Sequence, residues 1–278
     1  MSERRFLQVD VFSSVPFGGN PLAVVVDGDG LTTEQMQTFA KWTNLSETTF
    51  LLPPTDAGAD YRVRIFTTDA ELPFAGHPTL GSCHAWLASG GVPRSGDEVV
   101  QECAAGLVRL RRTGDEWSFA APPLIRSGPV DDDTLDRLVA VLRIDRAAVV
   151  DAEWADNGPG WVALLLRSAD DVLAVTPGPL DGFFIGLVGP TAPGSAESFE
   201  VRAFFPQGSM TAEDPVTGSL NASLAQWLVR SGVAVAPFRN RQGTALGRAG
   251  VISIEQTPDG QIWVGGSATT YIAGTVTI

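Results

Sequence analysis

Short apolar runs bounded by glycine and proline dominate the pattern of hydrophobic and polar positions along the chain. These runs include residues 22–26, 48–52 and 161–166. Runs of this length, rich in Val, Leu, Ile and Phe and flanked by turn residues, are typical of β-strands. Two segments instead place apolar residues at helical spacing, residues 32–43 and 131–141, and the first opens with a capping box of Thr32 and Gln35. The pattern predicts many short strands and two amphipathic surface helices.

The chain also contains an internal repeat. Residues 77–82 (HPTLGS) match residues 214–219 (DPVTGS), and upstream of them residues 64–66 (RIF) match residues 202–204 (RAF). Matching segments that follow the same order in both halves of a chain indicate two copies of one structural unit.

Each half is expected to be a sheet around a central helix. Residues 79–88 and 216–229 are small or apolar nearly all round, which is typical of a helix enclosed by other elements. The surface helix at 131–141 is interpreted as the second-half counterpart of the helix at 32–43. Together with the short strands, this predicts an α+β fold of two pseudo-symmetric halves, each a curved mixed sheet or barrel wrapped around one helix.

Composition and charge narrow the range of partners. The 278 residues include 19 Lys and Arg against 32 Asp and Glu, a formal charge of −13, and a field of this sign repels nucleic-acid phosphates and anionic lipid headgroups. No apolar run approaches the roughly 18 residues of a membrane-spanning helix, and no signal-peptide stretch follows Arg4 and Arg5. A cytoplasmic protein without nucleic-acid or membrane partners is expected.

Rare residue types argue against several chemistries. Lys41 is the only lysine and lies on the first surface helix, so neither a pyridoxal Schiff base nor a Gly-Lys phosphate loop is expected. His77, His84, Cys83 and Cys103 lack the spacing of a zinc site, and the two cysteines are predicted to be packed thiols. Neither a metal nor a cofactor is expected.

The starts of the two central helices are predicted to carry the chemistry. Pro78 and Pro215 suit the first helical position, which makes His77 and Asp214 the expected N-cap residues. Behind each cap lie free backbone N–H groups and the positive end of a helix dipole, and residues 217–219 let a ligand approach that backbone closely. If both helix starts face one cleft between the halves, that cleft suits a small carboxylate.

Taken together, these motifs resemble the PhzF family of phenazine-biosynthesis proteins, within the diaminopimelate-epimerase-like fold. The matching blocks are residues 9–12, 19–24, 44–50, 64–67, 72–78, 213–219, 242–243 and 247–248. The resemblance covers almost the whole chain. It implies two similar halves with the active site in the cleft between them, and a homodimer that needs no cofactor.

The boundary between the halves is expected near residue 118. A polar, turn-like stretch at 109–115 precedes this point, and Pro122 and Pro123, which do not suit a central strand, follow it. The resemblance implies that the last strand, 269–278, returns to the first half. The halves are therefore expected to be 1–118 and 119–268.

The resemblance also implies an activity. Family members are similar to cofactor-free isomerases, whose type reaction converts trans-2,3-dihydro-3-hydroxyanthranilate to a keto tautomer by moving a proton along an allylic system. Glu47 matches the family's catalytic glutamate, and His77 and Asp214 match positions that assist proton transfer or bind substrate. The other matching substrate-binding positions are Ser46, Gly76, Thr217, Gly218 and Ser219.

A glutamate suits this chemistry. One carboxyl group can act first as base and then as acid when a proton moves between two carbons on one face of a ring. Glu47 directly precedes the apolar run 48–52, where partial desolvation of its side chain is expected.

Two alternatives stay open. One is a ligand-binding member of the fold without catalysis, against which the retained Glu47 argues. The other is an amino-acid epimerase or racemase; related enzymes of that kind carry facing thiols at the positions of His77 and Asp214, whereas Cys83 and Cys103 lie elsewhere. Residues 213–219 read EDPVTGS where the phenazine enzymes carry an EDAATGS-type motif, so the resemblance implies the reaction class more firmly than the substrate.

Overall fold

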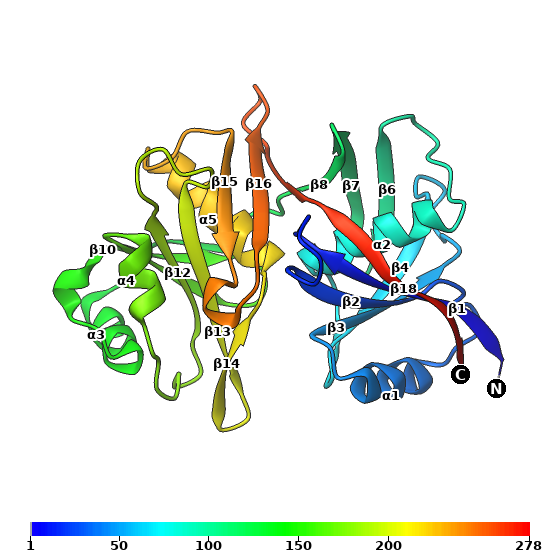
Figure 1. Ribbon diagram of the computed structural model, residues 1–278, viewed down its shortest axis with the longest axis horizontal. Helices are drawn as coiled ribbons and strands as arrows, with labels where there is room; N and C mark the ends of the chain where they lie inside the picture. The colour runs from blue at the N-terminus through cyan, green and yellow to red at the C-terminus, as the bar shows by residue number, and fades with distance from the viewer. Residues whose placement is uncertain (1) are drawn as a thin grey trace. The chain divides into compact units, whose positions relative to one another are not determined.

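A computed structural model describes residues 2–278 of the protein, and the chain divides into two compact units (Figure 1). Unit 1 combines Met1–Ala120 with Gly265–Ile278, and unit 2 is Ala121–Val264. The boundaries expected from the sequence, near residues 118 and 269, lie within a few residues of these limits.

Unit 1 is a mixed sheet with two helices. Its strands are β1 (Glu3–Val11), β2 (Asn20–Val25), β3 (Glu47–Leu52), β4 (Tyr61–Phe66), β5 (Glu71–Leu72), β6 (Glu98–Cys103), β7 (Gly106–Thr113), β8 (Glu116–Ala120) and β18 (Ala268–Thr277). Its helices are α1 (Thr33–Thr43) and α2 (Gly76–Ala88). The strands pair in the order β18–β1–β2–β3–β4–β6–β7–β8, with β5 beside one end of β4. The β2–β3 and β4–β6 pairs are parallel and the others are antiparallel.

Unit 2 repeats this pattern. Its strands are β9 (Arg126–Pro129), β10 (Val149–Asp156), β11 (Trp161–Leu166), β12 (Phe184–Pro190), β13 (Phe199–Gln207), β14 (Met210–Asp214), β15 (Phe238–Gln242), β16 (Gly250–Gln256) and β17 (Ile262–Gly266), the last of which crosses the unit limit. Its helices are α3 (Asp132–Leu142), α4 (Ala169–Ala174) and α5 (Gly218–Arg230), with short 3₁₀ turns at Arg146–Ala148 and Thr244–Leu246. The order β9–β10–β11–β12–β13–β15–β16, with parallel β11–β12 and β13–β15 pairs, matches that of unit 1.

Each unit encloses one helix, as the apolar character of the two segments predicts. Helix α2 contacts β1, β2, β3, β4, β6, β8 and β18. The approach is close at Gly81, where an added Cβ atom would lie 2.6 Å from the Cδ2 atom of Leu22. In unit 2, a Cβ atom on Gly186 of β12 would lie 2.4 Å from the Cδ1 atom of Leu220 on α5. The predicted α+β fold, two similar halves with a curved mixed sheet around a central helix, is confirmed.

The two amphipathic helices form as predicted, but the prediction that α3 is the counterpart of α1 in the repeat is wrong. Thr32 and Gln35 make both hydrogen bonds of the capping box of α1, and Asp131 caps α3. Helix α1 connects β2 to β3, and the helix that connects the corresponding strands β11 and β12 is the short α4. Helix α3 instead connects β9 to β10. Amphipathicity reports that a helix packs on one face, and it does not report which strands the helix joins.

Two hydrogen bonds define which residues of the two central helices correspond. Gln101 of β6 donates from its amide to the hydroxyl of Thr79 on α2, over 3.1 Å. In unit 2, Asn240 of β15 donates to the side-chain oxygen of Asn221 on α5, over 2.9 Å. Since β6 and β15 are equivalent strands, Thr79 corresponds to Asn221.

This register corrects the alignment of the repeated sequence motif. When Thr79 corresponds to Asn221, the counterpart of His77 is Ser219 and not Asp214. Asp214 ends β14 as Leu72 ends β5, and each pairs with the neighbouring long strand. The His-Pro and Asp-Pro pairs are therefore similar in sequence and both lie near a helix start. They do not occupy equivalent positions in the two units.

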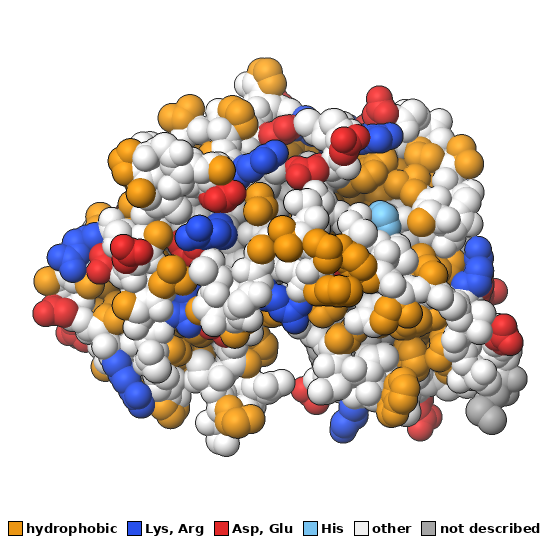
Figure 2. All heavy atoms as spheres, in the orientation of Figure 1, with side chains coloured by type: hydrophobic (Ala, Val, Ile, Leu, Met, Phe, Trp, Pro, Cys, Tyr) orange, Lys and Arg blue, Asp and Glu red, His pale blue; other side chains and the backbone are white. Residues whose placement is uncertain are grey.

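The surface carries many paired charges. On the face that Figure 2 shows, acidic and basic side chains are interspersed, without a large basic patch. Several arginines form surface ion pairs, among them Arg5 with Asp27 and Arg109 with Glu98. Within residues 2–278, no helix is long and apolar enough to cross a membrane.

Candidate functional site

Glu47 and His77 meet in unit 1. Glu47 is the first residue of β3, and His77 is the second residue of α2. The Oε2 atom of Glu47 lies 3.4 Å from the Nδ1 atom of His77. Asn20, the first residue of the parallel neighbour β2, places its side-chain nitrogen 3.4 Å from the same Nδ1 atom. Two polar side chains, from the neighbouring strands β3 and β2, therefore converge on one imidazole nitrogen of α2.

This group is largely withdrawn from water. His77 is only 3% exposed, and the side chain of Glu47 is 16% exposed. Burial lowers the pKa of His77 to about 3, so the ring is neutral near pH 7 and its contact with Glu47 is not an ion pair. At 3.4 Å this contact is longer than a normal hydrogen bond.

A neutral imidazole between an amide and a carboxyl group can hold its proton in two ways. With the proton on Nδ1, the ring can donate to the Glu47 carboxylate. With the proton on Nε2, Nδ1 can accept from Asn20 or from a protonated Glu47. The Nε2 atom is buried and has no hydrogen-bond partner within residues 2–278. The arrangement can therefore exchange a proton at Nδ1 and bind a polar group at Nε2.

A second group of predicted residues lies in unit 2. Asp214 ends β14, and the hydroxyl of Thr217 donates to its Oδ2 atom over 2.6 Å. Gly218 and Ser219 are the first two residues of α5. The Oγ atom of Ser219 accepts from the indole nitrogen of Trp161 over 3.1 Å. The structure thus brings Asp214, Thr217, Gly218 and Ser219 together.

The expected helix caps are wrong. Ala75 is the N-cap of α2 and Thr217 is the N-cap of α5, so His77 lies inside its helix and Asp214 lies before its own. Pro78 is the third residue of α2 and not the first. A proline is tolerated anywhere in the first turn, where its missing N–H has no intrahelical partner, so it does not fix the first helical residue.

The N-termini of α2 and α5 differ from those of the other helices. Thr32, Asp131 and Ser168 accept capping hydrogen bonds at α1, α3 and α4. Neither Ala75 nor Thr217 makes a side-chain capping bond, and the Thr217 hydroxyl is directed to Asp214 instead. First-turn N–H groups without a capping side chain, at the positive end of a helix dipole, suit an anionic group.

The remaining predicted residues flank these groups. Ser46 is exposed in the turn before Glu47, and Gly76 is buried as the first residue of α2. The expected cleft between the halves stays a prediction.

Sequence reasoning missed the role of buried amides. Asn20 contacts His77, and Gln242 at the end of β15 contacts both Asp214 and Thr217. Both amides lie in blocks that carry the family resemblance, but an amide in a short strand usually indicates a polar face. The signal that could have found them is a polar side chain directly at the end of an apolar strand.

The cysteines are packed, as predicted. Cys83 lies inside α2 and Cys103 ends β6; both are free and buried. Burial raises the pKa of both thiols. Within the part of the chain that the structure describes, no three His, Cys, Asp or Glu side chains are grouped so that they could hold a metal ion.

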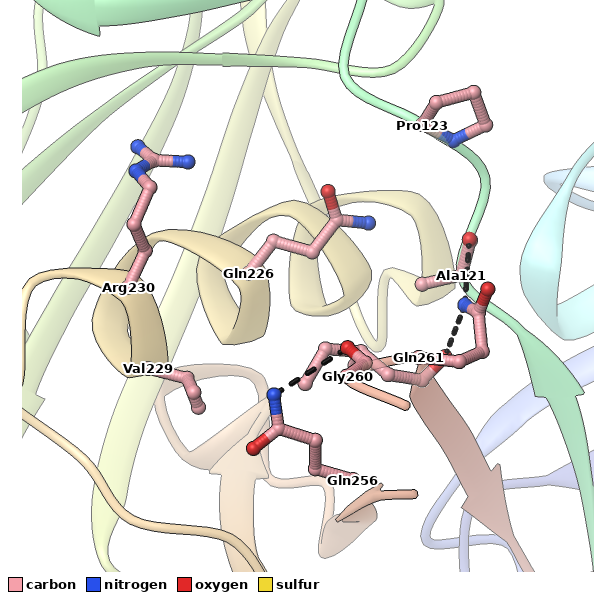
Figure 3. A pocket seen from close by; sticks show the side chains of 9 residues that line it. Ala121, Pro123, Gln226, Val229, Arg230, Gln256, Gly260 and Gln261 are labelled. Atoms are coloured by element: carbon pink, nitrogen blue, oxygen red, sulfur yellow. Dashed lines mark hydrogen bonds between the residues drawn. The ribbon is translucent and has the colours of Figure 1, made fainter. Parts of the chain in front are cut away.

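A cavity of about 360 Å³ in unit 2 lies away from these residues. Figure 3 shows its lining by the second half of α5 and by residues near β17. Its amides are engaged with the backbone: Gln226 donates to Pro122, Gln256 to Gly260, and Gln261 to Ala121. None of the predicted site residues lines this cavity, so it is not the candidate site.

The fold and these residues define a two-unit α+β protein with a buried acid–imidazole pair. The family model for the phenazine biosynthesis-like proteins, PhzC-PhzF, matches residues 9–274. The chain belongs to this family.

Known relatives match over nearly their full length. The chain is 37% identical to Antisense-enhancing sequence 1 of Schizosaccharomyces pombe, over 99% of each chain. It is 31% identical to a trans-2,3-dihydro-3-hydroxyanthranilate isomerase of Pseudomonas fluorescens, over 98% of this chain and 99% of that protein. A crystal structure of a PhzF-family protein from Bacillus anthracis shares the fold, with a TM-score of 0.83, 20% identity and full coverage of both chains. The similarity to the Pseudomonas fluorescens isomerase supports an enzyme of the isomerase type.

Proposed function

We propose that the protein is a cofactor-independent isomerase that moves a proton within a small carboxylate-bearing substrate. The substrate class is a cyclic or unsaturated acid of the trans-2,3-dihydro-3-hydroxyanthranilate type. The observation that carries the proposal is the Glu47 carboxyl group, 3.4 Å from a buried and neutral imidazole. The similarity to the Pseudomonas fluorescens isomerase supports the substrate class.

Glu47 is the proton carrier in this proposal. Its carboxylate takes a proton from one carbon of the substrate while the electron pair of that C–H bond enters the allylic system. The protonated carboxyl group then returns a proton to another carbon, and the double bond moves accordingly. Glu47 ends the cycle in its starting form, so the reaction needs no oxidant, reductant or second substrate.

His77 assists in two ways. Its Nδ1 atom stabilises Glu47, by donating to the carboxylate or by accepting from the protonated acid. Its Nε2 atom, buried and without a partner in the described structure, binds an amino or hydroxyl group of the substrate. Burial keeps the ring neutral, so it can both donate and accept.

Substrate binding is proposed first for the start of α5. The first-turn N–H groups at Gly218 and Ser219 suit a carboxylate because no side chain caps α5. Thr217, Ser46 and Gly76 complete the proposed binding residues. Asp214, which accepts from Thr217, is proposed to bind or protonate a polar group of the substrate.

Two other functions are less well supported. A racemase of the two-thiol kind needs reactive thiols beside the substrate, whereas Cys83 and Cys103 are buried in α2 and β6 with raised pKa values. A binding protein without catalysis does not need an acid beside a neutral imidazole. The homodimer that the family resemblance implies is also a proposal, and sedimentation velocity measures it directly.

Turnover in deuterated water tests the proposal. The protein is incubated with trans-2,3-dihydro-3-hydroxyanthranilate, and the ultraviolet spectrum and deuterium uptake into carbon are followed. We expect turnover with the wild type and its loss, by about 10²–10⁴-fold, in Glu47→Gln, which keeps the side-chain shape but cannot carry the proton. Glu34→Gln, an exposed glutamate on α1, is the matched control. Equal rates for Glu47→Gln and wild type would refute the role of Glu47.

A further inference from the structure

Gln242 holds the residues of unit 2 that are proposed to bind and protonate the substrate. We propose that Gln242 is a positioning residue, which acts through Thr217 on Asp214; this inference rests on the proposed function. Gln242 ends β15, is fully buried, and lies far along the chain from the α5 start that it contacts.

All the hydrogen-bonding capacity of the Gln242 amide is used. Its Oε1 atom accepts from the backbone N–H of Thr217 over 3.0 Å and from the side chain of Asn221 over 2.8 Å. Its Nε2 atom donates to the backbone oxygen of Asp214 over 3.1 Å and to the hydroxyl oxygen of Thr217 over 2.9 Å. One side chain therefore ties the end of β14 to the first residues of α5.

The orientation of this amide is fixed by its neighbours. The Asn221 nitrogen also donates to the Thr217 carbonyl, and the Asn221 oxygen accepts from Asn240. Asn221 can therefore present only a donor to Gln242, and the Thr217 backbone presents another. If the Gln242 amide were flipped, its NH2 group would face the N–H donors of Thr217 and Asn221. These buried donors would then lose their hydrogen bonds, which costs free energy.

The fixed amide directs the hydroxyl of Thr217. Because Gln242 donates to the hydroxyl oxygen, the hydroxyl hydrogen must point elsewhere, and it points to Asp214 over 2.6 Å. The same bond network keeps the Thr217 hydroxyl from capping α5. Gln242 thus fixes the hydrogen bond to the Asp214 carboxylate and leaves the first-turn N–H groups of α5 without a capping side chain.

The hydrogen bonds of Gln242 occur in unit 2 and have no counterpart in unit 1. Gln101 and Asn240 are equivalent framework amides, since each bonds to the corresponding residue of a central helix. Two residues further along these strands, Gln242 corresponds to Cys103. A thiol cannot make four hydrogen bonds, so unit 1 lacks this arrangement, and a role in support of the sheet alone does not explain Gln242.

A double-mutant cycle tests the inference on the full-length protein. Gln242→Met keeps the length of the side chain but removes all four bonds, and Thr217→Val removes the hydroxyl. We expect each change to lower kcat by about 10–100-fold, because the Asp214 carboxylate loses its fixed position. The kcat of the double variant is expected to be no lower than that of Gln242→Met alone, because both changes affect Asp214 through the same hydroxyl of Thr217.

Gln101→Met is the matched control, because Gln101 is also fully buried and also bonds to a central helix. It is expected to change kcat less than about 2-fold, with thermal unfolding of all variants followed by circular dichroism. Losses of kcat that multiply in the double variant, or an equal loss in Gln101→Met, would overturn the inference. The first would mean that Gln242 does not act through Thr217, and the second that burial of any amide explains the effect.

Amide hydrogen exchange separates this inference from the proposed function. Peptides that cover residues 214–222 are expected to exchange faster in Gln242→Met than in the wild type or in Gln101→Met. Faster exchange in a protein that turns over no substrate would refute the proposed reaction and support the contact role of Gln242. Unchanged exchange would refute the inference whatever the activity.

Discussion

The Nδ1 atom of His77 lies 3.4 Å from the Oε2 atom of Glu47, where the start of α2 meets the start of β3. The ring is almost fully buried, and the desolvation of its charged form lowers its pKa to about 3. A neutral ring can accept and donate at the same time, whereas a charged one can only donate. The relationship between these two residues therefore decides what the site can do with a proton.

The lowered pKa of His77 predicts how stability depends on pH. The unfolded chain binds a proton at this histidine below about pH 6.5, whereas the folded protein resists protonation down to about pH 3. The free energy of unfolding therefore falls as pH decreases through this window. At pH 4.5 the loss that His77 causes is on the order of 2–3 kcal/mol relative to pH 7.5.

The measurement is urea unfolding of wild type and His77→Asn between pH 7.5 and pH 4. The difference between the two proteins removes the contributions of the carboxylates that both contain. Wild type is expected to lose stability more steeply than His77→Asn on acidification. Parallel curves would show that His77 titrates alike in the folded and unfolded states.

The repeat contains two equivalent arginine–glutamate ion pairs that differ in burial, so the loss of stability on removing one partner is expected to differ between them. Arg202 and Glu213 pair over 2.7 Å with side chains 7% and 11% exposed, and Arg202 also donates to the backbone oxygen of Val175. The equivalent pair, Arg64 and Glu71, is 18% and 33% exposed. Removing one member of a buried pair leaves the other charge without compensation.

Glu213→Gln is therefore expected to lower the free energy of unfolding by about 3–5 kcal/mol, and Glu71→Gln by less than about 1 kcal/mol. Chemical denaturation of both variants measures the difference. Because the two pairs occupy equivalent strands, each variant is the control for the other. Similar losses would mean that burial does not set the strength of these pairs.

The sequence predicted the elements and the class of fold because these depend on local patterns. The capping box at Thr32 and the apolar run after Glu47 each encode their structure within a few residues. The enclosed helices were predictable from their uniformly apolar surfaces. The register between the halves was not, because it depends on hydrogen bonds between distant residues, such as Gln101 with Thr79.

The candidate site was predictable where a motif marks it and not where partners come from remote strands. Glu47, His77 and Asp214 lie in recognisable motifs. The pairing of His77 with Asp214 as equivalent helix caps was wrong, because a His-Pro or Asp-Pro pair tolerates several positions near a helix start. Gln242 was not assigned a role because its four bonds reach β14 and α5, which no local pattern reports.

The turn that leads into Asn20 is predicted to tolerate no side chain at Gly19. A Cβ atom there would lie 2.1 Å from the backbone oxygen of Val11 and 2.9 Å from the Oδ1 atom of Asp10. Gly19→Ala is therefore expected to shift β2 away from β1 and with it Asn20, which contacts His77. We expect a loss of roughly 1–3 kcal/mol in the free energy of unfolding and reduced turnover.

Gly274→Ala is the control for this change, because an added Cβ atom on Gly274 of β18 meets nothing within 4 Å. Its stability and activity are expected to match the wild type. Unfolding curves and turnover of the two variants decide the point. A fully active and stable Gly19→Ala would mean that the turn can relax without moving Asn20.

The two cysteines are predicted to be unreactive in the folded protein, unlike the catalytic thiols of racemases. Cys83 is fully buried and Cys103 nearly so, and burial raises the pKa of both thiols. Thiolate is the reactive form, so both side chains are expected to resist iodoacetamide at pH 8 in the folded protein and to react after unfolding in urea. Mass spectrometry counts the modified residues in each state, and activity is measured on the same samples. Unmodified protein with full activity agrees with a carboxyl group as the proton carrier. Rapid alkylation of Cys83 in the folded state, with loss of turnover, would indicate that a thiol carries the proton. It would contradict the role proposed for Glu47.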